Sequence, residues 1–179
     1  MTRPPWCTKL ACVDLRLRPP RLTDETDVVA ASSELAADDF PFAFRAAGQP
    51  FEAFVRMVDD HRHGRNLDPA WVESSWLLAV VGDEVVGRSS IRFVLNDSLR
   101  REGGHIGYAV RPMHRRRGYA TEILRQSVII ARASGVDDVL VTCDDSNVGS
   151  ATVIERCGGV LADVIAGTDG VPIRRYWIR

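Results

Sequence analysis

The sequence predicts an α/β fold of the mixed α+β kind: a central mixed β-sheet with helices on both faces. Three observations carry this prediction. The β-prone run Ile106 to Val110 stops at a proline, and the chain restarts at Gly118 with helical periodicity. The run from Val136 to Cys143 is nearly continuous in apolar residues, as in a strand covered on both faces. The span from Trp76 to Leu95 holds two β-rich runs around a turn, which predicts a hairpin.

Length and composition indicate one domain. The chain has 179 residues, of which 45% are hydrophobic and 26% charged, the values of an ordinary globular protein. We expect the domain to span residues 15–179, preceded by an arm of unclear role at residues 1–14. The net charge of −1 gives nucleic acid no general electrostatic reason to bind. No run of about 20 apolar residues is present and no secretion signal is recognisable, so we expect a cytoplasmic protein without membrane contact.

Cysteine and histidine spacing predicts no metal site. Cys7, Cys12, Cys143 and Cys157 form neither a Cys-x-x-Cys pair nor a zinc pattern, and we expect them to be reduced. The segment 61–63 offers only two imidazoles and no cysteine nearby, so a solvated loop is the better interpretation.

The first half of the chain reads as one strand and two helices. Residues Leu15 to Arg18 alternate before two prolines, as in an edge strand. Helices are expected at Glu25 to Ala37 and at Pro50 to His61 from the spacing of their apolar residues. Between them lies an acidic and aromatic segment, residues 38–44, whose three phenylalanines suit core packing or substrate contact.

The second half alternates strands and helices. After the hairpin, Asn96 to Gly104 is a polar connection. The helix that begins at Gly118 stops at Ser134-Gly135, and a further helix begins after Asn147 and ends at Gly158-Gly159. A closing antiparallel hairpin is expected from strands at residues 160–165 and 173–178.

The turn between residues 110 and 121 is the main candidate for function. The first amides of a helix have no partner inside the helix and carry the positive end of its dipole. Here they follow Arg115, Arg116 and Arg117, so the turn suits a phosphate. The alternative interpretation of the three arginines is a solvated surface turn.

Two motifs resemble those of the GNAT superfamily of acetyl-CoA-dependent N-acetyltransferases. Arg115-x-x-Gly118-x-Ala120 is similar to the family signature (Gln/Arg)-x-x-Gly-x-(Gly/Ala). The segment from Asn147 to Gly159 is similar to the helix Asn-x-x-(Ser/Ala) that closes on Lys-x-Gly-Phe in the family. The resemblance covers roughly residues 76–161.

The resemblance implies acetyl-CoA as the cosubstrate and no metal. The amides of residues 116–121 would hold the pyrophosphate, with arginine side chains adding charge. The pantetheine arm would lie beside Ala109 and Val110 like an added strand, in a gap where the central strands diverge, within reach of Asn147 and Ser150. The expected cofactor-binding residues are Ala109, Val110, Arg115, Arg116, Arg117, Gly118, Tyr119, Ala120, Thr121, Asn147 and Ser150. Helix capping is the alternative role for Asn147.

Transfer of an acetyl group to an amine needs the free base. His105 occupies about the place where many relatives carry a glutamate that relays the proton, and an imidazole has a suitable pKa. Glu102 is the reserve candidate, and the Val110 amide is a candidate oxyanion donor. The tyrosine that many relatives use to protonate the thiolate is replaced by Ile154, with Tyr108 and Tyr176 as other hydroxyls.

The sequence therefore predicts an N-acetyltransferase that moves acetyl from acetyl-CoA to a primary amine of a small molecule or peptide by direct attack. The alternative is a non-catalytic acyl-CoA-binding regulatory module, for which Ile154 is one argument. Nucleic-acid binding through the arginine cluster is the least favoured interpretation. The resemblance makes a homodimer plausible and leaves the acceptor and the acyl-chain preference open.

Overall fold

The computed structural model describes residues 14–38, 40–46 and 48–179. The arm expected at residues 1–14, with Cys7 and Cys12, lies outside these ranges except for its last residue. The strands are β1 (Leu15–Arg18), β2 (Ser74–Val81), β3 (Glu84–Arg92), β4 (Ile106–Val110), β5 (Val139–Asp144), β6 (Gly159–Ala166) and β7 (Pro172–Ile178). The helices are α1 (Glu25–Leu35), α2 (Phe51–Arg62), α3 (Asp97–Arg101), α4 (Tyr119–Ala133) and α5 (Val148–Arg156), with 3-10 turns η1 (Leu22–Asp24), η2 (Ala36–Asp38) and η3 (Pro112–His114).

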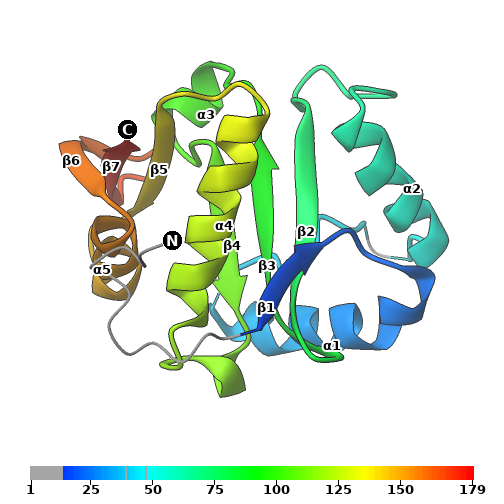
Figure 1. Ribbon diagram of the computed structural model, residues 1–179. Coiled ribbons are helices and arrows are strands. Elements are labelled where there is room, and N and C mark those ends of the chain that lie inside the picture. The colour runs from blue at the N-terminus through cyan, green and yellow to red at the C-terminus, as the bar shows by residue number, and fades with distance from the viewer. Residues whose placement is uncertain (1–13, 39, 47) are drawn as a thin grey trace, which may run out of the picture.

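The strands form two sheets (Figure 1). One has the order β1-β2-β3-β4 and the other the order β5-β7-β6, and every printed pairing is antiparallel. The α/β class expected from the sequence is confirmed, and the strands are divided into two sheets between β4 and β5. These strands begin side by side and then separate, as Figure 1 shows.

One close backbone contact holds the two sheets together at the start of β4. The His105 amide donates to the Leu140 carbonyl at 2.7 Å. A Cβ on Gly104 would lie 2.5 Å from the same carbonyl oxygen, and Gly104 has φ +58°. Any side chain at position 104 would clash with this carbonyl. Gly104 therefore allows the close contact that fixes where β4 and β5 meet.

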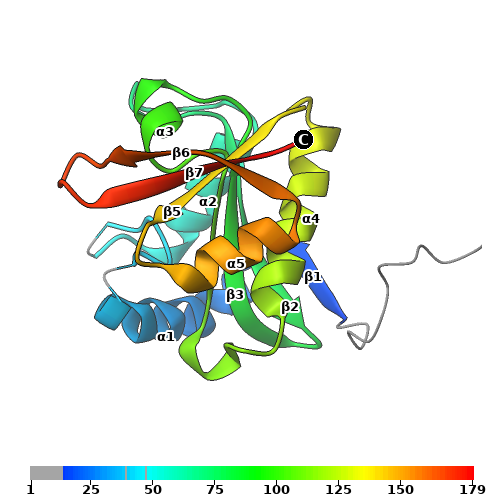
Figure 2. The same ribbon diagram turned by 90° about the vertical axis from the view of Figure 1, so that its left-hand side faces the viewer.

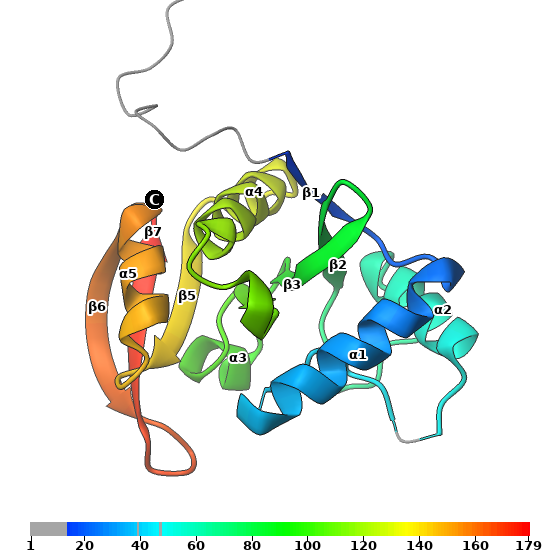
Figure 3. The same ribbon diagram turned by 90° about the horizontal axis from the view of Figure 1, so that it is seen from below.

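Helices cover both faces of the four-stranded sheet (Figure 3). Figure 3 shows α4 on one face and α1 with α2 on the other, while Figure 2 shows α5 lying against the smaller sheet. We call these the α4 face and the α1/α2 face. Along β4, Ile106 and Val110 pack with α4, whereas Ala109 packs with the α1/α2 residues. The alternation of a strand therefore places odd-numbered β4 residues on the α1/α2 face.

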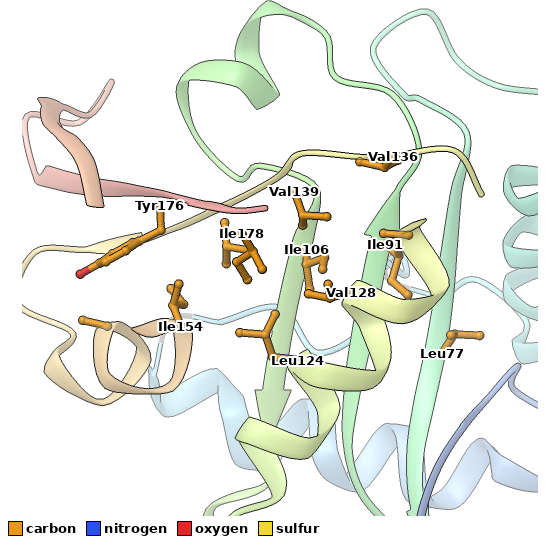
Figure 4. Close-up of a cluster of buried hydrophobic side chains, with 13 residues drawn as sticks. Leu77, Ile91, Ile106, Leu124, Val128, Val136, Val139, Ile154, Tyr176 and Ile178 are labelled. Carbon is orange, nitrogen blue, oxygen red and sulfur yellow. The ribbon is translucent and has the colours of Figure 1, made fainter. Parts of the chain in front are cut away.

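The core on the α4 face joins the two sheets (Figure 4). Leu124 and Val128 of α4 pack with Ile106 and with residues of β5 and β7, including the fully buried Tyr176. This continuous apolar cluster keeps β4 and β5 in fixed positions although no ladder joins them.

Several predicted boundaries shift and one element was not predicted. The polar connection at residues 96–104 contains the short helix α3, because the Asn96 side chain accepts a hydrogen bond from the Leu99 amide and caps it. The first helix ends at Leu35 and tightens into η2. The strand expected from Val136 begins at Val139.

Within the described ranges, no helix is long and apolar enough to cross a bilayer.

Candidate functional site

The turn before α4 presents a row of backbone donors that the protein leaves unused. The Arg115 amide donates to the Pro112 carbonyl, but the amides of residues 116–121 have no acceptor among the described residues. Arg116 has φ +64° and Gly118 has φ +83°, so the backbone between them curves into a concave nest. Such a nest, at the N-terminus of a long helix, is an anion site.

The arginine side chains of the turn divide into two kinds. The Arg115 guanidinium is used inside the protein, where Nε donates to the Val110 carbonyl at 3.2 Å and Nη2 contacts Asp38. Arg116 and Arg117 are exposed, and neither side chain has a partner in the part of the chain that the structure describes. Arg115 therefore stabilises the turn through contacts inside the protein, whereas the side chains of Arg116 and Arg117 are available to a ligand.

A partly buried ion pair connects the start of the turn to α1. Arg111 donates through Nε and Nη2 to the two carboxylate oxygens of Glu34, at 2.9 and 2.6 Å. Its Nη1 also donates to the Val85 carbonyl at 3.0 Å. The hydrogen bonds that Glu34 accepts from Arg111, more than the charge of Arg111, lower the pKa of Glu34. The position of the nest thus depends on a side chain that binds no ligand itself.

Along β4, the backbone amides of alternate residues are directed away from β3 and toward β5. The Arg111 amide bonds to the Val86 carbonyl, and the register pairs Ala109 with Arg88. In an antiparallel ladder the groups of the intervening residues face the other way. The amides of Tyr108 and Val110 therefore face the split between β4 and β5, whereas that of Ala109 belongs to the ladder. The Ala109 side chain is buried.

Helix α5 lines the other side of this split. The Asn147 side chain caps it by accepting from the Ser150 amide at 2.9 Å, so the capping role occupies the Asn147 oxygen. The Ser150 hydroxyl lies 2.9 Å from the Tyr108 hydroxyl. Burial raises the pKa of Tyr108 well above its usual range. A pair of neutral hydroxyls thus connects β4 with α5 across the split.

His105 lies where the two sheets meet, with its ring already bonded. The Leu140 amide donates to Nδ1 at 2.9 Å. A neutral imidazole that accepts at Nδ1 carries its proton on Nε2, so the lone pair a general base would use is engaged. Burial, followed by the charges of Arg100 and Arg92, lowers the pKa of His105. This geometry does not fit the expected base and suits a donor at Nε2.

Glu102, the reserve candidate, is also engaged. Its carboxylate accepts from the Thr168 amide at 2.6 Å and from the Thr168 hydroxyl at 3.1 Å, which ties the end of α3 to the β6–β7 turn. The other tyrosine, Tyr176, donates to Glu155 at 3.2 Å. Ile154 is fully buried in the core, which explains an apolar residue at this position.

The sequence reasoning missed two arginines on β3, one buried and one half-buried. Arg88 is 2% exposed and lies under the aromatic segment, with its guanidinium carbon 4.7 Å from the Phe40 ring centroid. Arg92 lies four residues further along the strand and is half-buried. Two arginines spaced by four within a strand that is otherwise buried were the available signal.

The segment 61–63 holds no metal site. His61 instead contacts the Trp71 ring, with ring centroids 5.1 Å apart. Across the described residues, no group of three histidine, cysteine, aspartate or glutamate side chains is placed to hold a metal ion.

The comparisons with known proteins agree on one fold. The profile of the acetyltransferase (GNAT) domain matches residues 14–160. Among curated proteins, no sequence matches the chain. The structure is similar to that of RimJ from Mycobacterium smegmatis in complex with CoA-disulfide, with a TM-score of 0.68 and 18% identity over 92% of this chain and 81% of that one.

Two further solved structures are similar over nearly their whole length. The microcin C7 self-immunity acetyltransferase MccE, in complex with acetyl-CoA and AMP, has a TM-score of 0.65 and 16% identity, covering 91% of each chain. A chimera of the spermidine N-acetyltransferase SpeG from Vibrio cholerae and hSSAT has a TM-score of 0.62 and 15% identity, covering 92% of this chain and 94% of that one. At these identities the likeness establishes the fold.

Proposed function

The chain belongs to the GNAT acetyltransferase family, and from this premise we propose that it transfers acetyl from acetyl-CoA to a primary amine of a small molecule or peptide by direct attack. The observation that carries the proposal is the row of unused amides at residues 116–121. We keep the cytoplasm as the expected location, where thiols such as Cys143 and Cys157 stay reduced. A homodimer stays a prediction.

The nest at the start of α4 holds the pyrophosphate of the cosubstrate in this proposal. Its amides are directed at one anion by the curvature at Arg116 and Gly118, and the exposed side chains of Arg116 and Arg117 add charge. Hydrogen bonds to charged groups contribute about 1.5–3 kcal/mol each, so a few of them give roughly micromolar affinity.

The split between β4 and β5 takes the pantetheine arm and the thioester. The outward amides of Tyr108 and Val110 offer the arm a strand-like partner, in place of the expected Ala109. The Val110 amide is the candidate donor to the oxyanion that forms when the amine attacks. Acetyl-CoA supplies the reactive thioester, and the chain supplies these fixed donors.

Proton transfers are assigned to groups at the ends of the split. We assign His105 the role of a hydrogen-bond donor through the N–H at Nε2. Its Nδ1 cannot act as a base, because it already accepts a hydrogen bond from the Leu140 amide. The hydroxyl pair of Tyr108 and Ser150 is the candidate proton source for the departing thiolate, and the proton that the attacking nitrogen loses as the amide forms restores the hydroxyl, so that amine and thioester give amide and thiol. A thiol with an ordinary pKa near 8.5 needs little assistance, and an α-amine with a pKa near 7.7–8.0 is partly free base at neutral pH. Glu102 then has a structural role.

Release of CoA thiol together with the mass of the acetylated product tests the proposal. The purified chain is incubated with acetyl-CoA and a panel of amines that differ in charge and length. We expect amine-dependent thiol release and one acetyl group added per thiol. The Gly118→Asp variant, in which a carboxylate enters the nest, should show neither. Thiol release that is independent of every amine would contradict the proposal.

The second candidate is a non-catalytic acyl-CoA-binding module. It is favoured by the buried Ile154 at the usual tyrosine position and by the engaged lone pair of His105. Tight binding of acetyl-CoA without transfer to any amine of the panel would select it.

A further inference from the structure

The α1/α2 face of β3 and β4 holds two guanidiniums, of buried Arg88 and half-buried Arg92, for which the described residues offer no carboxylate partner. Arg88 Nη1 donates to the Gly107 carbonyl at 3.2 Å and Nη2 to the Pro41 carbonyl at 2.9 Å, while Nε is buried without a partner. Arg92 Nη1 donates to the carbonyls of Gly103 and Gly104. Among the described residues, no carboxylate forms an ion pair with either guanidinium.

A buried charge of this kind is costly unless an anion offsets it. Carbonyl acceptors satisfy individual N–H groups but leave the charge uncompensated. Burial, with Arg92 beside it, lowers the pKa of Arg88 to about 9. The Phe40 and Phe44 rings, 4.7 and 5.3 Å from the Arg88 guanidinium carbon, shield it further from water. An anion bound here would therefore offset the cost of burying the guanidinium charge.

Gly107 leaves a space between the two guanidiniums. A Cβ added there would lie 3.7 Å from Nη1 of Arg88, 3.7 Å from Nη1 of Arg92 and 3.9 Å from Nη2 of Arg92. These guanidinium nitrogens are its nearest neighbours, at ordinary van der Waals distance. Because Gly107 has no side chain, no Cβ stands between a ligand on this face and these guanidinium nitrogens.

This space lies next to the proposed reaction centre, on the side away from the cofactor. The nest and α5 place the cofactor toward the α4 face, whereas Gly107 shares the α1/α2 face with Ala109. Gly107 directly precedes Tyr108, whose amide faces the split, and adjacent Cα atoms are only about 3.8 Å apart. The nearby cavity lined by Ser90 and Trp76 has a volume of only about 20 Å³, which is room for about one water.

We propose that Arg88 and Arg92 bind a carboxylate of the acceptor over Gly107, so that the acceptor is a short amine that carries a carboxylate, such as an amino acid. The inference rests on the proposed function and names its substrate class. A carboxylate is planar and matches the fork of a guanidinium. Because the two guanidiniums lie close to the split, an acceptor whose carboxylate binds them and whose amine reaches the thioester has few bonds between the two groups.

The test compares acceptors that differ in one end group. β-Alanine, β-alaninamide, 1,3-diaminopropane and O-phosphoethanolamine are assayed at saturating acetyl-CoA, and kcat/KM is measured for each. We expect β-alanine to exceed β-alaninamide by about tenfold or more, with the diamine poorest, since an unpaired buried cation rejects a second one. A preference for the amide or the diamine overturns the proposal. A preference for the phosphate end overturns the carboxylate assignment.

Two variants locate the preference. Gly107→Ala places a methyl group between the guanidiniums, and Arg92→Gln removes one of them; each should reduce the carboxylate-to-amide ratio to near one. Arg132→Gln, at the exposed end of α4, is the matched control and should keep the ratio. The amide reference cancels any general loss of folded protein. A wild-type ratio in Gly107→Ala would overturn the proposal.

A binding measurement separates failure of the site from failure of the proposed function. In the presence of CoA, β-alanine should raise the Tm of the wild-type chain but not that of Gly107→Ala. Stabilisation without any acetyl transfer would leave the site standing and reject the acetyltransferase. Transfer to amines with no effect of the carboxylate would do the reverse.

Discussion

Two pairs of arginines in this protein, Arg116 with Arg117 and Arg88 with Arg92, differ in their exposure to solvent. Arg116 and Arg117 are exposed beside a row of free amides, so the turn attracts an anion largely through backbone that is already in place. Arg88 lies under an aromatic segment with Arg92 further along the same strand, and an anion there would be bound by the side chains themselves. On the proposals above, the exposed group takes a phosphate with help from the backbone, whereas the group on β3 selects a carboxylate through its side chains.

The largest expected effect comes from reversing the charge of the exposed group. Arg117→Glu combined with Gly118→Asp puts two carboxylates where the pyrophosphate is proposed to bind. Loss of two or more charge-assisted bonds should weaken CoA binding by roughly 100-fold or more, measured by calorimetry. Arg132→Glu on the same helix is the control and should bind CoA normally. Equal affinity in all three proteins would remove the nest from the account.

The next effect concerns the anchor of the turn. Arg111→Met leaves Glu34 without its partner and the Val85 carbonyl without its donor, and should lower the free energy of unfolding by about 2 kcal/mol in urea. CoA affinity should fall as well, because the nest loses its fixed position. Arg132→Met is the control. Normal stability and normal affinity together would show that the pair does not hold the turn.

The pH dependence of the same pair follows from the lowered pKa of Glu34. A carboxyl whose folded pKa lies below its ordinary 4.5 stabilises the fold above that value and loses this contribution as pH falls through the folded pKa. The stability difference between the wild-type chain and Glu34→Gln should therefore be full at neutral pH and shrink below pH 4.5. A difference that grows on acidification would contradict the assignment.

The sequence was sufficient for the elements near the turn because their signals are local. The proline after β4, Gly118 and the helical spacing that follows are all contained within one short segment, and the antiparallel hairpin of β6 and β7 was also predicted. The family resemblance implied a gap where the central strands diverge, but the contact that fixes its position could not be predicted, because Gly104 and His105 meet Leu140 from a distant part of the sequence.

The roles of individual side chains were less accessible from the sequence for the same reason. The hydrogen bond at His105 Nδ1 comes from an amide 35 residues away, and the partner of the Arg115 side chain, Asp38, lies 77 residues away in η2. Arg88 gave little signal because its environment is formed by Phe40 and Phe44 from a distant loop. Only the folded chain brings these partners together.

A smaller effect tests the hydroxyl pair. Tyr108→Phe removes the hydroxyl 2.9 Å from Ser150 and should reduce kcat by about tenfold with little change in CoA affinity. Pre-steady-state release of thiol is the measurement. A kcat that stays at the wild-type value would exclude this hydroxyl as the proton source.

The smallest effect distinguishes the two arginine groups by salt. Raising ionic strength from 0.05 to 0.5 M, about tenfold, should weaken CoA binding several-fold because Arg116 and Arg117 are exposed, and screening acts on exposed charges. The KM for β-alanine should change less, because Arg88 is buried. The opposite order would indicate that the two regions have been assigned the wrong ligands.

The central claim is that the backbone of residues 116–121 binds the cosubstrate, and amide NMR during a CoA titration tests it most directly. The account predicts large downfield proton shifts for the amides of this row, with Gly118 among them, at the same midpoint as binding. Shifts confined to other parts of the chain while CoA binds would contradict it.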